Sequence, residues 1–176
     1  MGLNPKILIS VIILIIVLFA GAVYLFTSNQ NNRTVDNSNS SEKSLTSENT
    51  DYTAFFAIYT NGTFRVFTAP MYHNLSNDVF IEASNPNIVN VKKSNTTWRT
   101  FFETLPFELD ETCLTTGTKQ TFCTNSDFVL QFYLNGERNQ SALDQVINPG
   151  DKLLVTYDRE NASIIQQQLQ SIPNSQ

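Results

Sequence analysis

The chain has 176 residues, with 11 basic against 16 acidic side chains and a formal net charge of −5 at pH 7. This length suits one ordinary domain and a smaller segment. The acidic balance argues against nucleic acid or an anionic lipid surface as the partner, because proteins bind both through clustered Lys and Arg.

Segment 7–26 consists of twenty uncharged residues, ILISVIILIIVLFAGAVYLF. Twenty helical residues rise about 30 Å, the thickness of the hydrocarbon layer, so the sequence predicts a transmembrane helix here. A cleaved signal ending near Ala20-Gly21-Ala22 is the alternative, but the apolar run continues to Phe26 and favours an uncleaved anchor. Lys6 precedes the helix, so the positive-inside tendency predicts a single-pass cell-membrane protein with residues 1–6 in the cytoplasm and the rest outside.

Residues 27–50 form the next segment, which is dominated by Asn, Ser and Thr and contains only Val35 and Leu45 as apolar residues. Such a segment cannot bury enough apolar surface to offset its chain entropy, so we expect a flexible, disordered linker. The remaining residues, 51–176, are expected to form one extracellular domain.

Potential N-glycosylation sites support an outside location. The Asn-x-Ser/Thr pattern marks surface positions in exported proteins, although an Asn-rich polar composition also produces it by chance. Seven candidates occur, at Asn32, Asn39, Asn61, Asn74, Asn95, Asn139 and Asn161.

Cys113 and Cys123 are the only two cysteines in the chain. Nine residues separate them, which differs from the C-x-x-C spacing of oxidoreductases. A zinc site needs more ligands than two thiolates, and the chain has one histidine and no third cysteine. Outside the cytoplasm such a pair is oxidised, so we predict a structural disulfide closing a solvent-facing turn.

The first half of the domain predicts a hairpin, a strand and a helix. Two β-rich runs flank Asn61-Gly62, a strong hairpin signal, and the first run is apolar on both faces, which indicates a central strand. A short strand follows at 78–83. The next segment carries a helical stripe with a Thr96 or Thr97 cap and a stop at Pro106, formed by Trp98, Phe101, Phe102 and Leu105.

The second half predicts two strands and a short helix. Residues 128–134 predict a strand, because Phe128, Leu130, Phe132 and Leu134 alternate with Val129, Gln131 and Tyr133. The strand ends at a second tight turn, Asn135-Gly136. A type II turn at 148–151, with Pro149 and Gly150 in its centre, leads into the last strand. An amphipathic helix is expected at about 161–171.

These elements predict an α+β domain: a small, mainly antiparallel sheet with one packed helix and a short C-terminal helix. The strand 132–136 with its Asn-Gly end, followed by the Gly-Asp turn and strand 149–155, resembles the end of a ubiquitin-like β-grasp domain. The sulfur carriers of that group end in Gly-Gly, whereas this chain ends at Gln176, so the resemblance does not imply their activity.

A second resemblance covers about residues 70–165. The capped helix, the two-cysteine loop and the two turns are similar to a family of uncharacterised archaeal proteins with an N-terminal anchor and a small exported domain. That family often carries His-x-His in its third strand, where this chain has Phe80-Ile81-Glu82, so no metal site carries over. The resemblance implies location and fold, and rests on Thr97, Phe101-Phe102, Cys113, Cys123, Asn135-Gly136 and Gly150-Asp151.

The sequence offers few chemical groups for catalysis. His73 is the only histidine, and no nucleophile elbow accompanies it, so a hydrolase is the least favoured function. Glu108, Asp110 and Glu111 could hold a cation, but their spacing is not that of an EF-hand, and a solvated acidic strand end is favoured. No phosphate-binding or zinc motif occurs, so no cofactor and no metal are expected.

The sequence therefore favours a non-catalytic membrane protein whose extracytoplasmic domain contacts other membrane or envelope proteins, as an accessory subunit or an envelope component. The alternative is an exported domain that binds a carbohydrate or another small ligand on an aromatic sheet face. The candidate rings are Phe55, Tyr59, Phe67 and Tyr133.

Overall fold

The computed structural model describes residues 48–159 and 161–173, which belong to the second of two compact units in the chain, Leu45–Gln176. The predicted membrane helix at 7–26 and the predicted linker, up to residue 47, lie outside the described residues. So do the candidate glycosylation sites Asn32 and Asn39.

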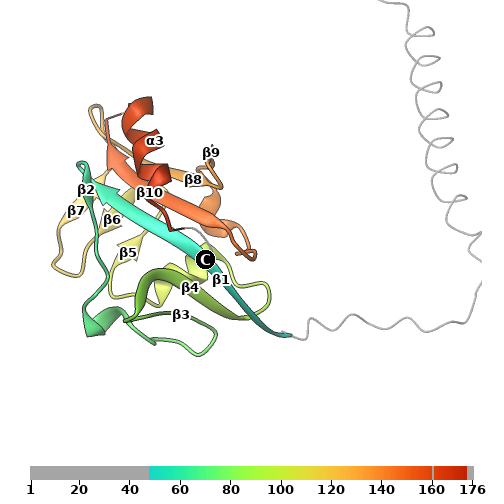
Figure 1. Cartoon of the computed structure of the whole chain (residues 1–176). Coiled ribbons are helices and arrows are strands. Elements are labelled where there is room, and N and C mark those ends of the chain that lie inside the picture. The colour runs from blue at the N-terminus through green and yellow to red at the C-terminus, as the bar shows by residue number, and fades with distance from the viewer. Residues whose placement is uncertain (1–47, 160, 174–176) are drawn as a thin grey trace, which may run out of the picture. The chain divides into compact units, whose positions relative to one another are not determined.

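The described part is built mainly from strands (Figure 1). Its elements, in chain order, are β1 (Asn49–Thr60), β2 (Thr63–Phe64), the 3₁₀ turn η1 (Pro70–Tyr72), β3 (Val79–Glu82), β4 (Asn85–Lys93), α2 (Trp98–Glu103), β5 (Glu108–Leu109), β6 (Cys113–Thr115), β7 (Thr121–Cys123), β8 (Val129–Leu134), β9 (Glu137–Arg138), the 3₁₀ turn η2 (Ala142–Asp144), β10 (Lys152–Asp158) and α3 (Ala162–Gln170).

Two sheets share these strands. The larger sheet has seven strands in the order β3-β4-β1-β10-β8-β9, and β2 pairs with the end of β1. β1 lies beside β10 in parallel, with Phe55 opposite Lys152 and Thr60 opposite Tyr157, while its other neighbours are antiparallel. The smaller sheet has the order β5-β6-β7.

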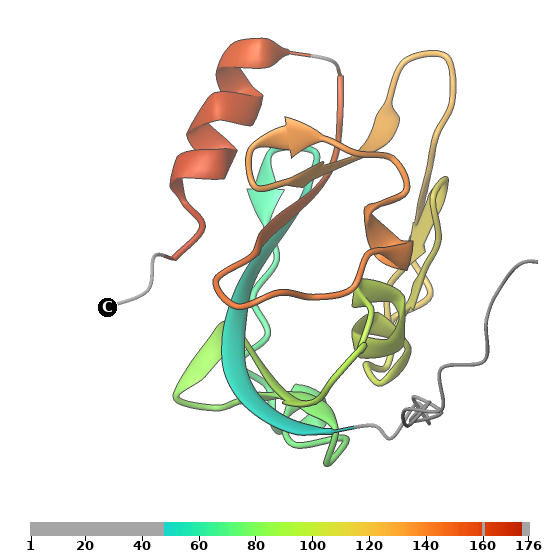
Figure 2. The same cartoon turned by 90° about the vertical axis from the view of Figure 1, so that its right-hand side faces the viewer.

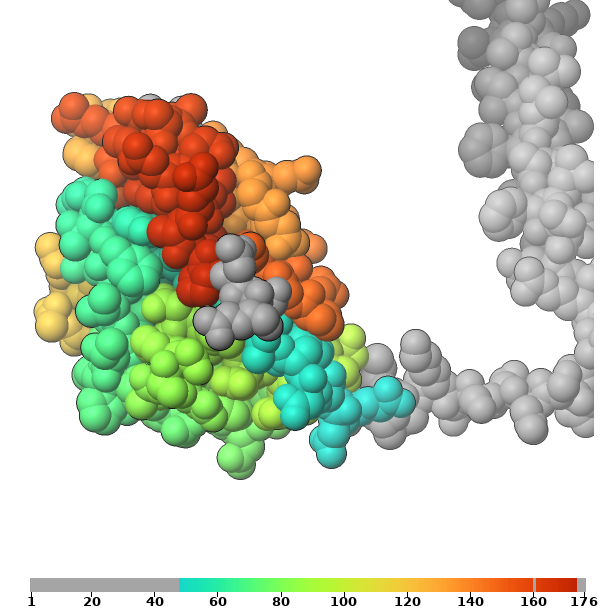
Figure 3. Space-filling view, in the orientation of Figure 1, coloured from blue at the N-terminus to red at the C-terminus, as the bar shows by residue number. Residues whose placement is uncertain are grey.

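β1 is the centre of the large sheet, as the sequence predicted, because both of its faces are apolar and both are covered. Phe56 and Ile58 point into the main core, where the Phe56 ring lies 5.3 Å from that of Phe101 on α2. Phe55 and Ala57 point into a second cluster with Ile172. Figure 2 shows α2 and α3 on opposite sides of β1, and Figure 3 shows α3 lying over the outer face between β2 and the last strands.

Several local predictions are confirmed. Asn61 and Asn135 adopt positive φ angles of 51° and 54° before their glycines, as tight hairpin turns require. The helix α2 begins after Thr97, whose hydroxyl oxygen accepts a hydrogen bond from the Thr100 N–H at 3.2 Å. The C-terminal helix begins after Asn161, which caps it through its side-chain oxygen.

The predicted fold class must be corrected. The prediction was a transmembrane helix and a linker, followed by an α+β domain with one helix packed on a mainly antiparallel sheet and a short C-terminal helix. The described residues instead form mostly sheet, and α2 and α3 have only six and nine residues. None of the helices in residues 48–159 and 161–173 has the length and apolar character needed to cross a membrane. The sequence prediction missed β4 and the whole small sheet.

Candidate functional site

The disulfide hairpin is the first component of the candidate site. Cys113 and Cys123 face each other across β6 and β7, with Cα atoms 4.1 Å apart and the two sulfurs bonded. The predicted pairing is therefore confirmed, and the predicted solvent-facing turn is present at Gly117–Thr118, where residues 117–121 are exposed. The bond closes a strand pair whose inner residues, Leu114 and Phe122, are 3% and 4% exposed and belong to the main core.

A carboxylate fixes the base of this hairpin. Asp110 accepts hydrogen bonds from the Thr112 N–H and hydroxyl, at 2.7 and 2.8 Å, and from the Cys113 N–H at 2.7 Å. These bonds, led by the one from the Thr112 N–H, hold the pKa of Asp110 below its ordinary value.

The other two predicted acidic residues have separate partners. Glu111 pairs with Arg99, and Glu108 lies 3.4 Å from the Lys119 ammonium. Arg99 also donates to Asp144 at 2.7 Å, and this hydrogen bond is the main cause that lowers the pKa of Asp144. In the described part of the chain, no three His, Cys, Asp or Glu side chains gather as a metal site would require.

Residues 64–73, which we call the loop wall, form the second component. This segment runs beside β1 as far as Arg65, whose N–H donates to the Ile58 carbonyl at 2.8 Å. Phe67 then turns inward, with its ring 5.2 Å from that of Phe56. The His73 Nε2 lies 2.8 Å from the Phe67 carbonyl, so it donates to that oxygen and closes the loop. The His73 side chain thus bonds to the backbone of its own loop. Within the described residues, no hydrogen bond joins it to a serine or an aspartate.

A groove of about 370 Å³ runs between the loop wall and the disulfide hairpin. Its base includes Ile58 and Leu114, both buried. Its rim carries large apolar residues that water reaches: Phe64, Val66 and Met71 are 36%, 63% and 52% exposed. The Phe64 ring also packs against that of Tyr59, with 5.2 Å between the ring centres. The three rim residues are a majority of the large apolar side chains exposed in the described part. Exposed apolar residues scattered singly need no explanation, so their position around one groove makes the groove the candidate site.

Arg65 is the one charged side chain among the groove residues. Its Nε donates to the Thr60 hydroxyl at 2.5 Å, and its guanidinium carbon lies 5.1 Å from the centre of the Phe122 ring on the hairpin. This cation–π contact links the two walls. Within the described residues, no carboxylate lies within ion-pairing distance of Arg65.

Gly117, at the hairpin end, lines the groove and lies close to the backbone of Pro106. A Cβ added there would lie 2.9 Å from the Pro106 carbonyl oxygen, which is closer than side-chain carbons approach backbone. The same Cβ would lie 3.8 Å from Met71 Cε, so the Met71 side chain already spans the groove to the hairpin. Methionine is a flexible, polarizable side chain that adapts to different partners.

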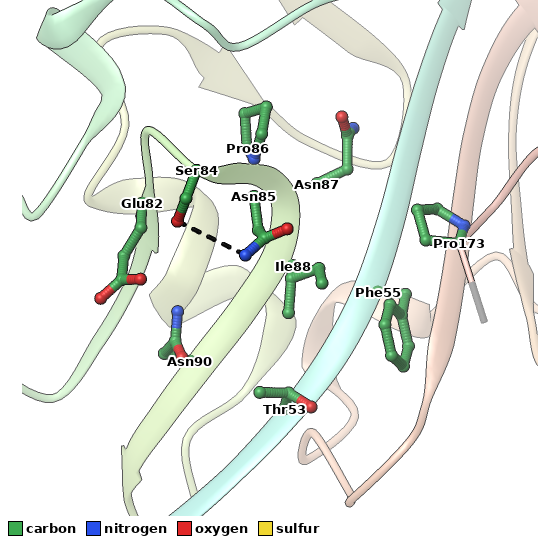
Figure 4. A pocket seen from close by; sticks show the side chains of 10 residues that line it. All are labelled: Thr53, Phe55, Glu82, Ser84, Asn85, Pro86, Asn87, Ile88, Asn90 and Pro173. Atoms are coloured by element: carbon green, nitrogen blue, oxygen red, sulfur yellow. Dashed lines mark hydrogen bonds between the residues drawn. The ribbon is translucent and has the colours of Figure 1, made fainter. Parts of the chain in front are cut away.

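A second hollow, of about 470 Å³, lies on the outer face of the sheet (Figure 4). The β3–β4 hairpin contributes Glu82, Ser84 and three asparagines to its rim, and Phe55, Pro86 and Ile88 add apolar surface. Asn87 already donates to the Phe56 carbonyl at 3.2 Å, and Asn85 to Ser84 at 3.4 Å. This hollow offers both hydrogen-bonding groups and apolar surface.

The four predicted platform rings do not share one open face. Phe67 belongs to the main core, on the opposite side of the sheet from the others. Phe55 is only 2% exposed beneath the C-terminal tail. The Tyr59 hydroxyl lies 2.7 Å from that of Ser171, and the Tyr133 hydroxyl donates to Gln131 at 2.7 Å.

The five described candidate glycosylation residues lie in turns or at a helix start. Asn61, Asn74 and Asn95 are exposed and have positive φ angles, which asparagine tolerates better than most residues. Asn139 is half-buried and accepts a hydrogen bond from the Ser141 N–H at 3.0 Å. Asn161 caps α3. Turn geometry therefore gives a structural reason for these asparagines that is independent of glycosylation.

No family model, curated protein or solved structure matches this chain. Sequence reasoning missed the groove, because it placed Val66 in the second strand of the predicted hairpin and gave Met71 no role. The available signal was the apolar character of these two residues on either side of Pro70, where the hairpin was predicted to end.

Proposed function

We propose that this protein is a non-catalytic, extracytoplasmic binding protein that contacts a membrane or envelope protein through the groove. The observation that carries the proposal is the gathering of Phe64, Val66 and Met71 on the groove rim. Leaving these side chains in water costs free energy that a partner would recover by covering them, at about 25 cal/mol per Å² of apolar area.

The disulfide supports both the location and the role. Disulfides persist in oxidising compartments and are rare in the cytosol. Here the bond staples one wall of the groove, so that wall keeps its shape when a partner binds, which lowers the entropic cost of association. The net charge of −5 disfavours nucleic acid as the partner.

The alternative function is binding of a carbohydrate or similar polar ligand in the asparagine-lined hollow. Its support is the set of amide and hydroxyl groups around that hollow, which suit sugar hydroxyls. We rank this function second, because Asn87 and Asn85 already donate hydrogen bonds within the protein, whereas Val66 and Met71 at the groove are exposed apolar side chains that a partner would cover.

Photo-crosslinking in the cells that make the protein tests the leading proposal. A benzophenone side chain in place of Val66 should give a discrete protein adduct, whereas one in place of Val146, an exposed apolar residue outside the groove, should not. Met71→Asp should abolish the Val66 adduct. Leu75→Asp is the matched control, since Leu75 is 45% exposed, near Met71 in sequence and outside the groove lining. Equal crosslinking from Val66 and Val146 would refute the proposal.

A further inference from the structure

The edge of the loop wall carries backbone groups that are open to a new strand. β2 pairs only with β1 in the described part. Because the Arg65 N–H points to the Ile58 carbonyl, strand alternation directs the N–H and C=O of Phe64 and Val66 away from β1. Val66 lies just beyond β2, and no backbone hydrogen bond within the described residues uses its N–H or C=O. An extended peptide is the ligand that such an edge pairs with.

The groove beside that edge selects for an apolar side chain. In a strand, alternate side chains point to the same face, so a peptide paired at Val66 would direct every second side chain toward the groove. Met71 lies across the opening and Leu114 is buried at the base, so one large apolar side chain would lie between them. Met71 has the flexibility to move aside for it.

The charge at the groove selects for an acid. Arg65 is held by Thr60 and by the Phe122 ring, which position its guanidinium without neutralising it. A guanidinium presents a planar fork of donors that matches a carboxylate. Arg65 has no carboxylate partner among the described residues and lies in an otherwise uncharged groove. It is therefore complementary to an Asp or Glu next to the apolar anchor.

From these three features we infer that the groove binds an extended segment of a partner protein, in which a large apolar residue stands beside an Asp or Glu. The peptide backbone pairs with the Phe64–Val66 edge, the apolar side chain enters between Met71 and Leu114, and the carboxylate binds Arg65. This inference rests on the proposed function and adds the chemistry of the partner to it.

The test uses the full-length chain, in mild detergent because residues 7–26 are apolar, and a phage library of random octapeptides as the probe. Selected peptides should share a large apolar residue next to Asp or Glu. A synthetic copy of the strongest should bind with a Kd that rises about tenfold or more when its acid is changed to the amide, because that change removes a charge-assisted bond without altering the protein. N-methylation of alternate backbone amides should abolish binding if the peptide pairs as a strand.

Variants of the protein locate the site. Arg65→Gln should remove the preference for an acid while keeping the apolar preference, Met71→Asp should abolish binding, and Leu75→Asp should leave the Kd unchanged. Arg65→Gln also removes the contacts with Thr60 and Phe122, so the thermal midpoint of this variant is measured as a control for its stability. The peptide with its acid changed to the amide tests the same charge contact on the unaltered protein.

The outcomes separate the inference from the function beneath it. Selected peptides that lack an acid, or that bind Met71→Asp equally well, overturn the inference. A Val66 crosslink without any peptide selection leaves the proposed function and rejects an extended segment as the occupant. Concentration-dependent dimerisation that Met71→Asp abolishes would reject it in favour of a second copy of the chain. Failure of both crosslinking and selection overturns function and inference together.

Discussion

Reduction of the Cys113–Cys123 bond should lower the thermal midpoint of the domain by about 10 °C. The two cysteines are ten positions apart, and in the chain-entropy description a loop of this size contributes about 2.8 kcal/mol by restricting the unfolded chain. The unfolding entropy of about 125 described residues is roughly 260 cal/mol/K near 60 °C, and dividing the free energy by this entropy gives the shift.

The folded state should hardly change on reduction. The hairpin keeps its strand pairing with Leu114 opposite Phe122, its third strand β5, and the turn that Asp110 fixes. The far-ultraviolet circular dichroism at 20 °C should therefore be the same with and without reductant, and peptide binding in the groove should persist at low temperature. Only the midpoint of the melting curve should move.

The assay compares melting curves of the full-length chain, in mild detergent, with and without a phosphine reductant. The double variant Cys113→Ala/Cys123→Ala serves as the control, since it should melt near the reduced protein and ignore the reductant. Mass spectrometry of untreated protein should show no free thiol. An unchanged midpoint on complete reduction would refute the view that the bond acts on the unfolded chain, and loss of the sheet signal at 20 °C would refute the view that it leaves the folded state intact.

Three further substitutions test the packing and the electrostatics. Gly117→Ala should lower the free energy of unfolding, measured with urea, by about 1–3 kcal/mol and weaken the Val66 crosslink, because the new Cβ would lie 2.9 Å from the Pro106 carbonyl oxygen. An unchanged free energy of unfolding and an unchanged crosslink would contradict this. Phe101→Ala, at a fully buried ring, should cost about 3–5 kcal/mol in the same assay, and a loss below about 1 kcal/mol would show that the core is misassigned. Asp110→Asn should lower the thermal midpoint at pH 7, and the difference should vanish on acidification. The folded-state pKa of Asp110 is lowered, so its stabilisation is present above the ordinary carboxyl pKa and is lost as the pH falls through the lowered value; a difference that persists at pH 2 would contradict the assignment.

The parts of the fold that were predicted correctly are those governed by local chemistry. Asn61 and Asn135 stand at positive φ before glycine because two-residue hairpins demand it. The stripe on α2 was readable because a helix repeats every 3.6 residues over the length of the pattern. The cysteine pair was readable because the chain has no other thiol.

The parts that were missed depend on contacts between distant segments. β4 begins with Asn85-Pro86, which reads as a turn, and Asn87 and Asn90 interrupt the apolar residues along the strand. Strands β5 to β7 have two or three residues each, too few for a period to be visible. The groove forms only where the loop wall packs against the disulfide hairpin, so the sequence of neither segment alone predicts it.

The parallel pairing of β1 with β10 has a consequence for how this protein is made. The two strands that form the middle of the sheet lie at opposite ends of the domain sequence, with Phe55 paired to Lys152. Closing so long a loop is entropically costly and slows folding. The β1 edge that β10 occupies must therefore remain open while nearly the whole domain is synthesised. Nascent chains that stop before β10 would display an unpaired apolar strand, which makes this stage of biogenesis the one most exposed to aggregation and to chaperone capture.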